Sequence, residues 1–364
     1  MHLSLTLSIY LGKQFLLGIG LALAILVGLV LVVDLVELLR RAASEDMGLG
    51  LVISMAVLKL PVMAQKALPF ATLFGGIFTF ARLTRTHELV VARAAGVSVW
   101  QFLLPAMLIA IGLGIIVVTI VNPLSAAMAG KYDRLEAKYF HKNPSLLAVS
   151  PGGLWLRQAD GEGQSVIHAE SVSDRGFDLK NVIIFLYDIG GEEFLGRIDA
   201  ESARLATPFW VLSNALLSLP GKPGELFDTY KLPTTLTLEQ IQDSFASPET
   251  MSFWTLPGFI RTLQEAGFTA VKHRVHWHSV LSLPLFLSAM VLIAATFALR
   301  LNVGGSTSIL VLGGVLTGFC LFVLSDIVLA LGLSGKIPAS LAAWAPAGAS
   351  TMFGISLLFH LEDG

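Results

Sequence analysis

The chain has 364 residues, of which 54% are hydrophobic and 14% are charged, and its formal net charge is −2 at pH 7. Soluble domains carry about 25% charged residues, so this composition is typical of an integral membrane protein. A net charge so close to zero excludes a general affinity for nucleic acid. The single cysteine, Cys320, excludes a disulfide framework and a cysteine-based metal site. The chain also lacks a Walker-type phosphate loop, so we expect no bound cofactor and no ATPase chemistry of that kind.

Six apolar segments are long enough to cross a membrane as helices, since a helix rises about 1.5 Å per residue and the hydrocarbon core is about 30 Å thick. The segments cover residues 14–39, 52–81 and 99–121 in the first part of the chain, and 278–299, 309–333 and 341–359 in the last. The sequence therefore predicts an α-helical membrane protein with six transmembrane helices, three on each side of a polar insertion.

The insertion, residues 140–275, holds 27 of the chain's 50 charged residues and cannot lie in lipid. Short runs rich in Val, Ile, Leu and aromatic residues alternate there with turn-forming residues, which predicts an all-β domain of sandwich or jelly-roll type. The predicted strands are residues 152–158, 165–172, 181–188, 193–205 and 209–219. Residues 252–279 have helical spacing and return the chain to the membrane. We therefore expect three parts, residues 1–135, 136–250 and 251–364.

The short loops favour an N-terminus in the cytoplasm, because cytoplasmic loops carry an excess of Lys and Arg. With this orientation five basic residues are inside and three are outside. The inner set is Lys13, Arg82, Arg85, Arg93 and Arg300, and the outer set is Arg40, Arg41 and Lys336. The β domain is then extracytoplasmic, which in a bacterium means the periplasm or the outside of the cell.

Several ionisable residues lie within or beside the apolar segments, where an unpaired charge costs several kcal/mol. They are the acids Asp34, Glu37 and Asp326 and the bases Arg40, Arg41, Lys59, Lys66, Lys131 and Arg134. Most fall in the outer half of the bilayer, and Lys66 is closest to its middle. Two interpretations remain open. Either Asp34 or Glu37 pairs with Lys59 or Lys66 while the other bases reach toward water, or the charges line a chamber that binds a charged headgroup.

The loop between the second and third segments is helical in pattern, with apolar and charged residues on separate faces over residues 82–96. Gly96 is a plausible helix C-cap. Such a helix can lie on the membrane surface, or it can be a coupling helix that docks into a partner protein. Its mixed charges and its small residues near Gly96 favour docking.

Several motifs carry a resemblance to a known family, and one of them is the helix that leads to "HSVLSLPL" at residues 278–285. Four more motifs carry the same resemblance. They are "YLGKQF" at residues 10–15, "HELVVARAAG" at 87–96, "VNPLSAAMAGKY" at 121–132 and "GGLWLR" at 152–157. In their order and spacing the chain resembles the YjgP/YjgQ (LptF/LptG) family of lipopolysaccharide export permeases, and it is more similar to the LptG branch. The resemblance implies six transmembrane helices with an inserted periplasmic jelly roll, in the inner membrane of a Gram-negative bacterium.

The same resemblance implies a non-catalytic permease subunit of an ABC lipid exporter, which serves outer membrane biogenesis. The subunit would pair with an LptF-like permease, receive energy from a cytoplasmic LptB-like ATPase dimer, and pass lipopolysaccharide to LptC-like and LptA-like periplasmic proteins. Phosphates of the lipid headgroup suit basic side chains. The headgroup candidates are Arg40, Arg41, Lys59, Lys66, Lys131 and Arg134, and the ATPase-coupling candidates are Arg85, His87, Glu88, Arg93 and Gly96.

The chain departs from the family pattern at Asp34, where LptG-like proteins often carry a basic residue. Either the bound lipid carries less phosphate, or Lys59 and Lys66 supply the missing charge, or Lys66 neutralises Asp34. Three other functions remain open: a mechanotransmission-type ABC permease, a membrane receptor with a periplasmic β sensing domain, and an ion-coupled transporter. The lack of long stalks, of a cytoplasmic output domain and of clear charge pairs in mid-membrane makes each of them less favoured than lipid export.

Overall fold

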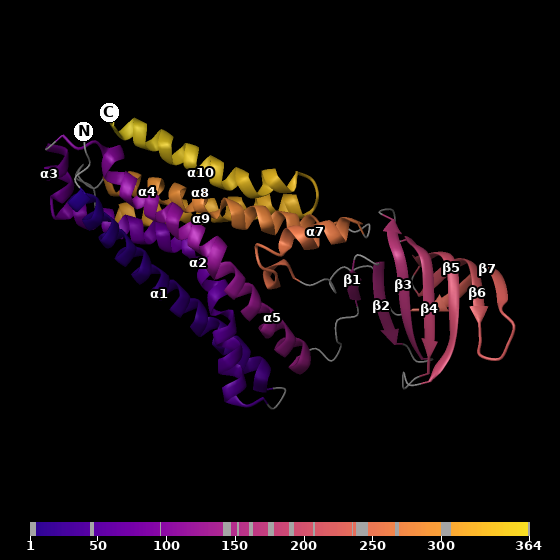
Figure 1. Cartoon of the computed structure of the whole chain (residues 1–364). Helices are drawn as coiled ribbons and strands as arrows, with labels where there is room; N and C mark the ends of the chain where they lie inside the picture. The colour runs from indigo at the N-terminus through magenta and orange to yellow at the C-terminus, as the bar shows by residue number, and fades with distance from the viewer. Residues whose placement is uncertain are drawn as a thin grey trace. The chain divides into compact units, whose positions relative to one another are not determined.

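The computed structural model describes residues 5–43, 47–94, 96–140, 147–150, 153–159, 163–173, 178–188, 193–206, 208–234, 236–237, 247–265, 269–299 and 307–362. Two compact units divide the chain. One comprises Met1–Leu135, Glu249–Trp254 and Val271–Gly364, and the other comprises Glu136–Pro248 and Thr255–Ala270. Each unit is described by itself (Figure 1).

Within the described residues, six helical stretches are long and apolar enough to cross a membrane, which confirms the predicted number and order. They are α1 (Leu5–Ala43), α2 (Leu49–Arg85), α4 (Val99–Ile116) with its continuations, α8 (Val271–Leu299), α9 (Thr307–Leu333) and α10 (Ala339–Glu362). Each contains its predicted apolar segment. The sequence pattern locates the apolar part of each helix and underestimates its length, because the helices continue through polar residues at their ends.

The third span shows this lengthening most clearly. After α4 the chain forms a short π-helical stretch, η1 (Val117–Val121), and continues as α5 (Asn122–Tyr139). The combined 41 residues extend about 60 Å, twice the thickness of a hydrocarbon core. The second half of α5 therefore lies beyond the apolar layer and leads into the β domain.

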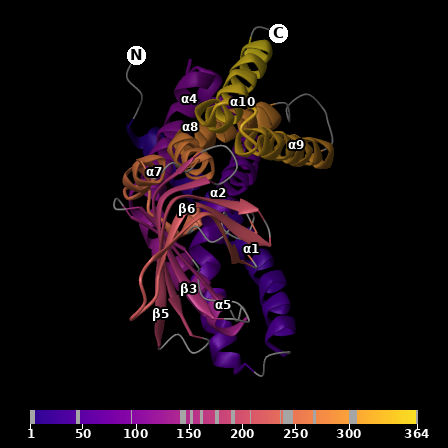
Figure 2. The same cartoon turned by 90° about the vertical axis from the view of Figure 1, so that its right-hand side faces the viewer.

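Helix α8 is the centre of the membrane unit and contacts α2, α4, α9 and α10 (Figure 2). It is the most buried of the six spans, and Leu287 and Val291 are fully enclosed. In contrast, α1 and α9 expose most of their apolar surface. Close packing uses small residues: an added Cβ at Gly75 of α2 would lie 2.7 Å from the carbonyl oxygen of Gly18 in α1. The bundle is therefore packed around α8, with α1 and α9 at its margins.

The helical bundle has two distinct ends. The terminal end carries both chain termini and α3 (Glu88–Ala94), and the domain end is the one where α1 turns into α2 and α5 leads out to the β domain (Figure 1). The chain returns from the β domain through a short 3-10 turn, η2 (Pro248–Thr250), and α7 (Leu256–Glu265). The helical return predicted over residues 252–279 is thus divided between α7 and the start of α8.

The β domain is one antiparallel sheet of seven described strands. The strands are β1 (Leu147–Ser150), β2 (Gly153–Ala159), β3 (Gln164–Ser173), β4 (Asp178–Tyr187), β5 (Phe194–Ala206), β6 (Phe209–Ser218) and β7 (Glu225–Pro233). Each strand pairs with the next in sequence, so the described strands form a curved meander. This confirms the all-β domain; the interleaved pairing of a two-Greek-key jelly roll is not found among the described strands.

One face of the sheet forms a dry core. Leu156, Ile167, Ile184 and Ile198 lie opposite one another on successive strands and are almost completely buried. Trp210 is also fully buried, and its indole N–H donates to Gln158 Oε1 at 3.2 Å. The Thr234 hydroxyl donates to the same oxygen at 2.7 Å, and the Gln158 amide donates to the Pro233 carbonyl at 3.1 Å. Gln158 therefore provides hydrogen-bond partners for the Trp210 indole N–H, the Thr234 hydroxyl and the Pro233 carbonyl, which would otherwise lack one.

Candidate functional site

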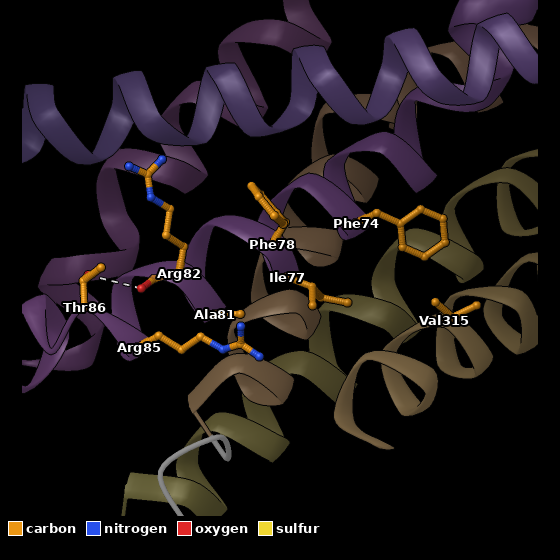
Figure 3. Close-up of a pocket in the computed structure, with 8 residues that line it drawn as sticks. All are labelled: Phe74, Ile77, Phe78, Ala81, Arg82, Arg85, Thr86 and Val315. Carbon is orange, nitrogen blue, oxygen red and sulfur yellow. Dashed lines mark hydrogen bonds between the residues drawn. The ribbon is translucent and has the colours of Figure 1, made fainter. Parts of the chain in front are cut away.

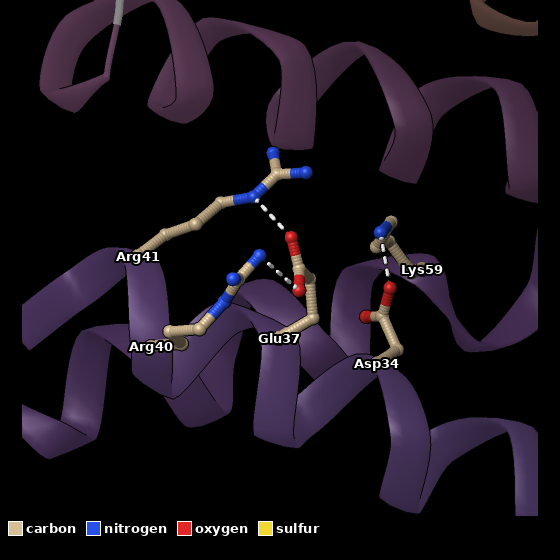
Figure 4. Close-up of polar contacts among 5 residues, drawn as sticks. All are labelled: Asp34, Glu37, Arg40, Arg41 and Lys59. Atoms are coloured by element: carbon tan, nitrogen blue, oxygen red, sulfur yellow. Dashed lines mark hydrogen bonds and ion pairs between the residues drawn. The ribbon is translucent and has the colours of Figure 1, made fainter.

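An ion pair joins α1 to α2 near the domain end. Lys59 Nζ lies 2.5 Å from Asp34 Oδ1 (Figure 4). The same Nζ lies 4.9 Å from the centre of the Tyr132 ring on α5. The two residues meet because α1 and α2 are antiparallel and joined by a short turn, with both positions about ten residues from it. Of the alternatives left open by the sequence, Lys59 and not Lys66 neutralises Asp34. The second carboxylate oxygen, Oδ2, is buried and has no hydrogen-bond partner within the described residues.

Glu37 holds both arginines at the end of α1. Its two oxygens accept from Arg40 Nη2 and Arg41 Nε at 2.9 Å each, across one helical turn (Figure 4). The side chains remain accessible, with exposed fractions of 77% for Arg40, 49% for Arg41 and 39% for Glu37. Pairs of this kind contribute little to stability because water and salt screen them. The guanidinium groups therefore lie at the surface, and their pairing with Glu37 adds little to stability.

Lys66, the base nearest the middle of its span, forms an ion pair with an acid that the sequence pattern did not single out. Its Nζ lies 2.9 Å from Glu249 Oε1, in the turn that returns from the β domain. The same turn is held nearby, where the Phe253 backbone N–H donates to Asn122 Oδ1 at 2.7 Å. Sequence reasoning missed Glu249 and Asn122. The polar Asn122 at the end of an apolar segment is the one signal that points to this contact.

The remaining headgroup candidates lie on α5. Lys131 is exposed and forms no ion pair with the described residues, while Arg134 Nε donates to the Gly130 carbonyl at 3.0 Å. Asp326, near the end of α9, is exposed and takes part in none of the ion pairs among the described residues. The structure thus places two of the predicted acids in separate groups: Asp34 pairs with Lys59, and Glu37 forms a triad with Arg40 and Arg41.

The sequence predicts the coupling helix over residues 82–96, but in the structure the separate helix covers only Glu88–Ala94. Helix α2 continues through Arg85, and the chain then turns at His87, whose φ of 60° lies in the left-handed region. A helix cannot continue through that conformation. The separate helix α3 begins at Glu88, whose carboxylate accepts from the Thr86 hydroxyl at 2.8 Å. Arg85 therefore belongs to α2, and His87 forms the turn.

Gly96 ends α3 as predicted. Its φ is 84°, and the Val97 backbone N–H donates to the Ala92 carbonyl at 3.1 Å. That bond and the left-handed glycine are the marks of a Schellman cap, in which glycine avoids the strain of a side chain. The Arg93 side chain and Arg300 lie outside the described residues.

Helix α3 is attached to the bundle through the first helix. The Tyr10 side chain lies beside the Glu88 carboxylate, and Arg82 Nη1 donates to Gln14 Oε1 at 3.3 Å. Leu89 anchors the other face of α3 in the core. Tyr10 and Gln14 both belong to the "YLGKQF" motif, whose role the sequence alone did not indicate. The motif connects α1 to the segment that carries Glu88.

Comparison with known proteins adds to these observations. Residues 9–360 match the model of the family described as lipopolysaccharide export system permease LptF/LptG. The chain is 26% identical over 364 residues to the lipopolysaccharide export system permease protein LptG of Escherichia coli K12, which covers 96% of this chain and 97% of that protein. It is 23% identical to LptG of Haemophilus influenzae over 94% of each chain. The permease protein LptF of E. coli K12 is 32% identical over 152 residues, covering 41% of this chain and 39% of that protein. The family match spans nearly the whole chain, so this protein belongs to the LptF/LptG family of lipopolysaccharide export system permeases.

Proposed function

We propose that this chain is the transmembrane permease subunit of an ABC exporter that takes lipopolysaccharide from the outer leaflet of the inner membrane and passes it to a periplasmic bridge. The observation that carries the proposal is the family match over residues 9–360, which includes all six spans and the inserted sheet. Relatives named LptG align over 94% or more of both chains, so the common layout extends through the whole molecule.

Arg40 and Arg41 are the proposed contacts for the phosphorylated headgroup. Both guanidinium groups are exposed, and their carboxylate partner Glu37 lies within one turn of the same helix. A phosphate offers bidentate, doubly charged acceptors, which bind arginine more strongly than a screened carboxylate does. An arriving phosphate would therefore displace Glu37. Lys131 of α5, which has no ion pair among the described residues, is a second contact for the headgroup.

Lys59 and Lys66 have a positioning role in this proposal. Each is paired with an acid, Lys59 with Asp34 and Lys66 with Glu249. The Lys59–Asp34 pair is partly buried, so removing Lys59 would leave the acid uncompensated at membrane depth, which is costly, whereas the exposed Lys66–Glu249 pair costs less to break. Asp34 therefore does not reduce the charge that faces the lipid, because Lys59 compensates it. The headgroup charge falls to Arg40, Arg41, Lys131 and Arg134.

The energy of ATP hydrolysis is proposed to reach the permease at the terminal end of the bundle, through α3. A separate LptB-like ATPase dimer would contact α3, where Glu88 is held at the first turn and the apolar side chains of Val90 and Val91 are 41% and 67% exposed. Exposed valines beside a charged residue fit a protein interface better than open water. Movement of α3 would reach α1 through Tyr10 and Gln14, so that ATP hydrolysis by the partner changes the packing of the spans.

The β domain is the proposed exit path, and its location is the periplasm. Its apolar face is closed by packing in this structure, so an acyl chain can enter only when that face opens. Strand β7 ends the described sheet at one edge, whereas α7 lies against β1 at the other. An unpaired strand edge can accept a strand of another β domain. LptC-like and LptA-like bridge proteins are the expected partners there, and an LptF-like permease is the expected partner in the membrane.

Purification of the full-length chain from its native membrane tests this function. We expect a separate ATPase, a second permease of the same family and lipopolysaccharide to be recovered with it, and ATP to drive lipopolysaccharide release from the reconstituted complex. A chain that exports lipid without any ATPase would contradict the assignment. A complex that hydrolyses ATP and never contacts lipopolysaccharide would instead favour the mechanotransmission-type permease.

A further inference from the structure

A cavity of about 510 Å³ opens beside α2 near the terminal end of the bundle (Figure 3). Its walls come from Phe74, Ile77 and Phe78 of α2 and from Val315 of α9, and two arginines, Arg82 and Arg85, line its outer part. The volume lies within the range of about 300–1,000 Å³ that is typical of small-molecule sites. The cavity is at the opposite end of α2 from Lys59, so the headgroup chemistry proposed above does not use it.

Along the axis of α2, one end of the cavity is apolar and the other end is cationic. From Phe74 to Arg85 the helix rises about 16 Å, which is close to one leaflet of a hydrocarbon core about 30 Å thick. Phe78 and Val315 remain exposed although they are apolar. A ligand that covers them needs an apolar tail roughly one leaflet long and an anionic group at the arginine end.

Most N–H donors of the two arginines are not used in hydrogen bonds to the described residues. Arg82 uses Nη1 to reach Gln14, and Figure 3 shows its side chain turned away from that of Arg85. A guanidinium carries five N–H donors, so most remain available on Arg82. The Arg85 side chain forms no hydrogen bond or ion pair with the described residues. Both lie in the last turn of α2, whose dipole alone would repel an anion, so their charge is what makes an anionic ligand favourable here.

We propose that this cavity binds an anionic phospholipid of the inner leaflet, with an acyl chain along Phe74, Ile77 and Val315 and the phosphate at Arg85, where Arg82 adds positive charge to the same end of the cavity. The leaflet follows from the proposed orientation with the N-terminus in the cytoplasm. Thr86, whose hydroxyl donates to Glu88, also lines the cavity. The bound lipid therefore contacts the segment that begins α3, and its occupancy stiffens the link between α2 and the coupling helix.

The test measures lipid binding to the purified complex that contains the full-length chain, by native mass spectrometry during titration with dioleoyl phosphatidylglycerol. The variants are Arg85→Gln, which removes a charge that has no ion pair among the described residues, and Val315→Trp, which fills the apolar part. Lys13→Gln and Leu316→Trp are matched controls, because each alters an exposed residue of the same kind on α1 or α9 that does not line the cavity. Loss of one charge-assisted contact corresponds to about a tenfold weaker affinity.

We expect about tenfold weaker binding in both test variants, wild-type binding in both controls, and weaker binding of dioleoyl phosphatidylcholine by the wild type. Equal binding by all variants would overturn the proposal. Displacement of phosphatidylglycerol by inorganic phosphate alone would show a free-anion site and would overturn the lipid assignment, as would a preference for lipopolysaccharide. Lipopolysaccharide crosslinking at the domain end is measured on the same variants, so failure here is distinguishable from failure of the export function.

Discussion

Lys59 of α2 donates to Asp34 of α1 while the other oxygen of that carboxylate stays buried without a partner among the described residues. The acid is therefore compensated in charge but incompletely satisfied in hydrogen bonding. Such a group is stable only while its single partner stays in place. The pair acts as a brace that holds the first two spans together, one helical turn along α1 from Glu37, the partner of Arg40 and Arg41.

A double-mutant cycle on this brace measures its contribution. Asp34→Asn and Lys59→Met each leave one member without its partner, and we expect each to lower the free energy of unfolding by about 1–2 kcal/mol, since the pair is partly buried. The double variant is expected to lose less than the sum of the two, because neither charge is then stranded. Thermal unfolding of the purified protein in detergent gives the values, and additive losses would contradict the brace.

Glu37→Gln is expected to strengthen lipopolysaccharide binding several-fold. The substitution removes the carboxylate that competes with phosphate for Arg40 and Arg41 and leaves the shape of the side chain unchanged. Arg41→Gln is expected to weaken binding, and the double variant to lie between the two. Binding of labelled lipopolysaccharide to the reconstituted complex provides the measurement. Weaker binding in Glu37→Gln would show that the carboxylate helps to hold the lipid.

Charge reversal on α3 is expected to uncouple the ATPase. Glu88→Lys removes the acceptor for the Thr86 hydroxyl and places a like charge near Arg82. We expect at least a tenfold loss of ATP-driven lipopolysaccharide release with normal membrane insertion, and the same direction of change for Arg93→Glu. Lys13→Gln on the neighbouring helix serves as the control. Normal release in both α3 variants would exclude this segment from the contact with the ATPase.

Gln158 is expected to be essential to the β domain. Gln158→Ala leaves the buried Trp210 N–H and Thr234 hydroxyl without their acceptor, which costs about 1–3 kcal/mol for each group. The neighbouring Arg157→Ala, an exposed position on the same strand, is expected to change stability by less than about 0.5 kcal/mol. Limited proteolysis of the full-length protein compares them, and equal resistance of the two variants would show that the network contributes nothing.

The membrane spans and most strands are predictable from sequence because each depends on local pattern. Long apolar runs can satisfy their backbone only as helices in lipid, and alternating runs in β2 to β6 bury one face. The edge strand β7 lacks this signal, since Glu225, Asp228 and Lys231 are exposed along it. Exposed charges along an edge strand interrupt the apolar alternation by which a strand is recognised in a sequence. The four-residue β1 is too short to carry a pattern.

The pairing of charges is only partly predictable. The sequence places Asp34 and Lys59 at similar distances from one turn, so a pair between the first two spans could be expected. It cannot indicate Glu249 as the partner of Lys66, because the two are 183 residues apart and meet only through the fold. The break between α2 and α3 is also hidden, since it depends on the left-handed backbone of His87, a residue that helices tolerate.

Site-specific photo-crosslinking in living cells tests the central claim most directly. A photoreactive residue replaces Arg41 or Lys131 at the domain end, and Lys13 at the terminal end in a matched control. The account predicts lipopolysaccharide adducts at positions 41 and 131, a loss of these adducts when ATP is depleted or the ATPase contact on α3 is disrupted, and no adduct at position 13. Active lipopolysaccharide export with no adduct at either of the first two positions would contradict it.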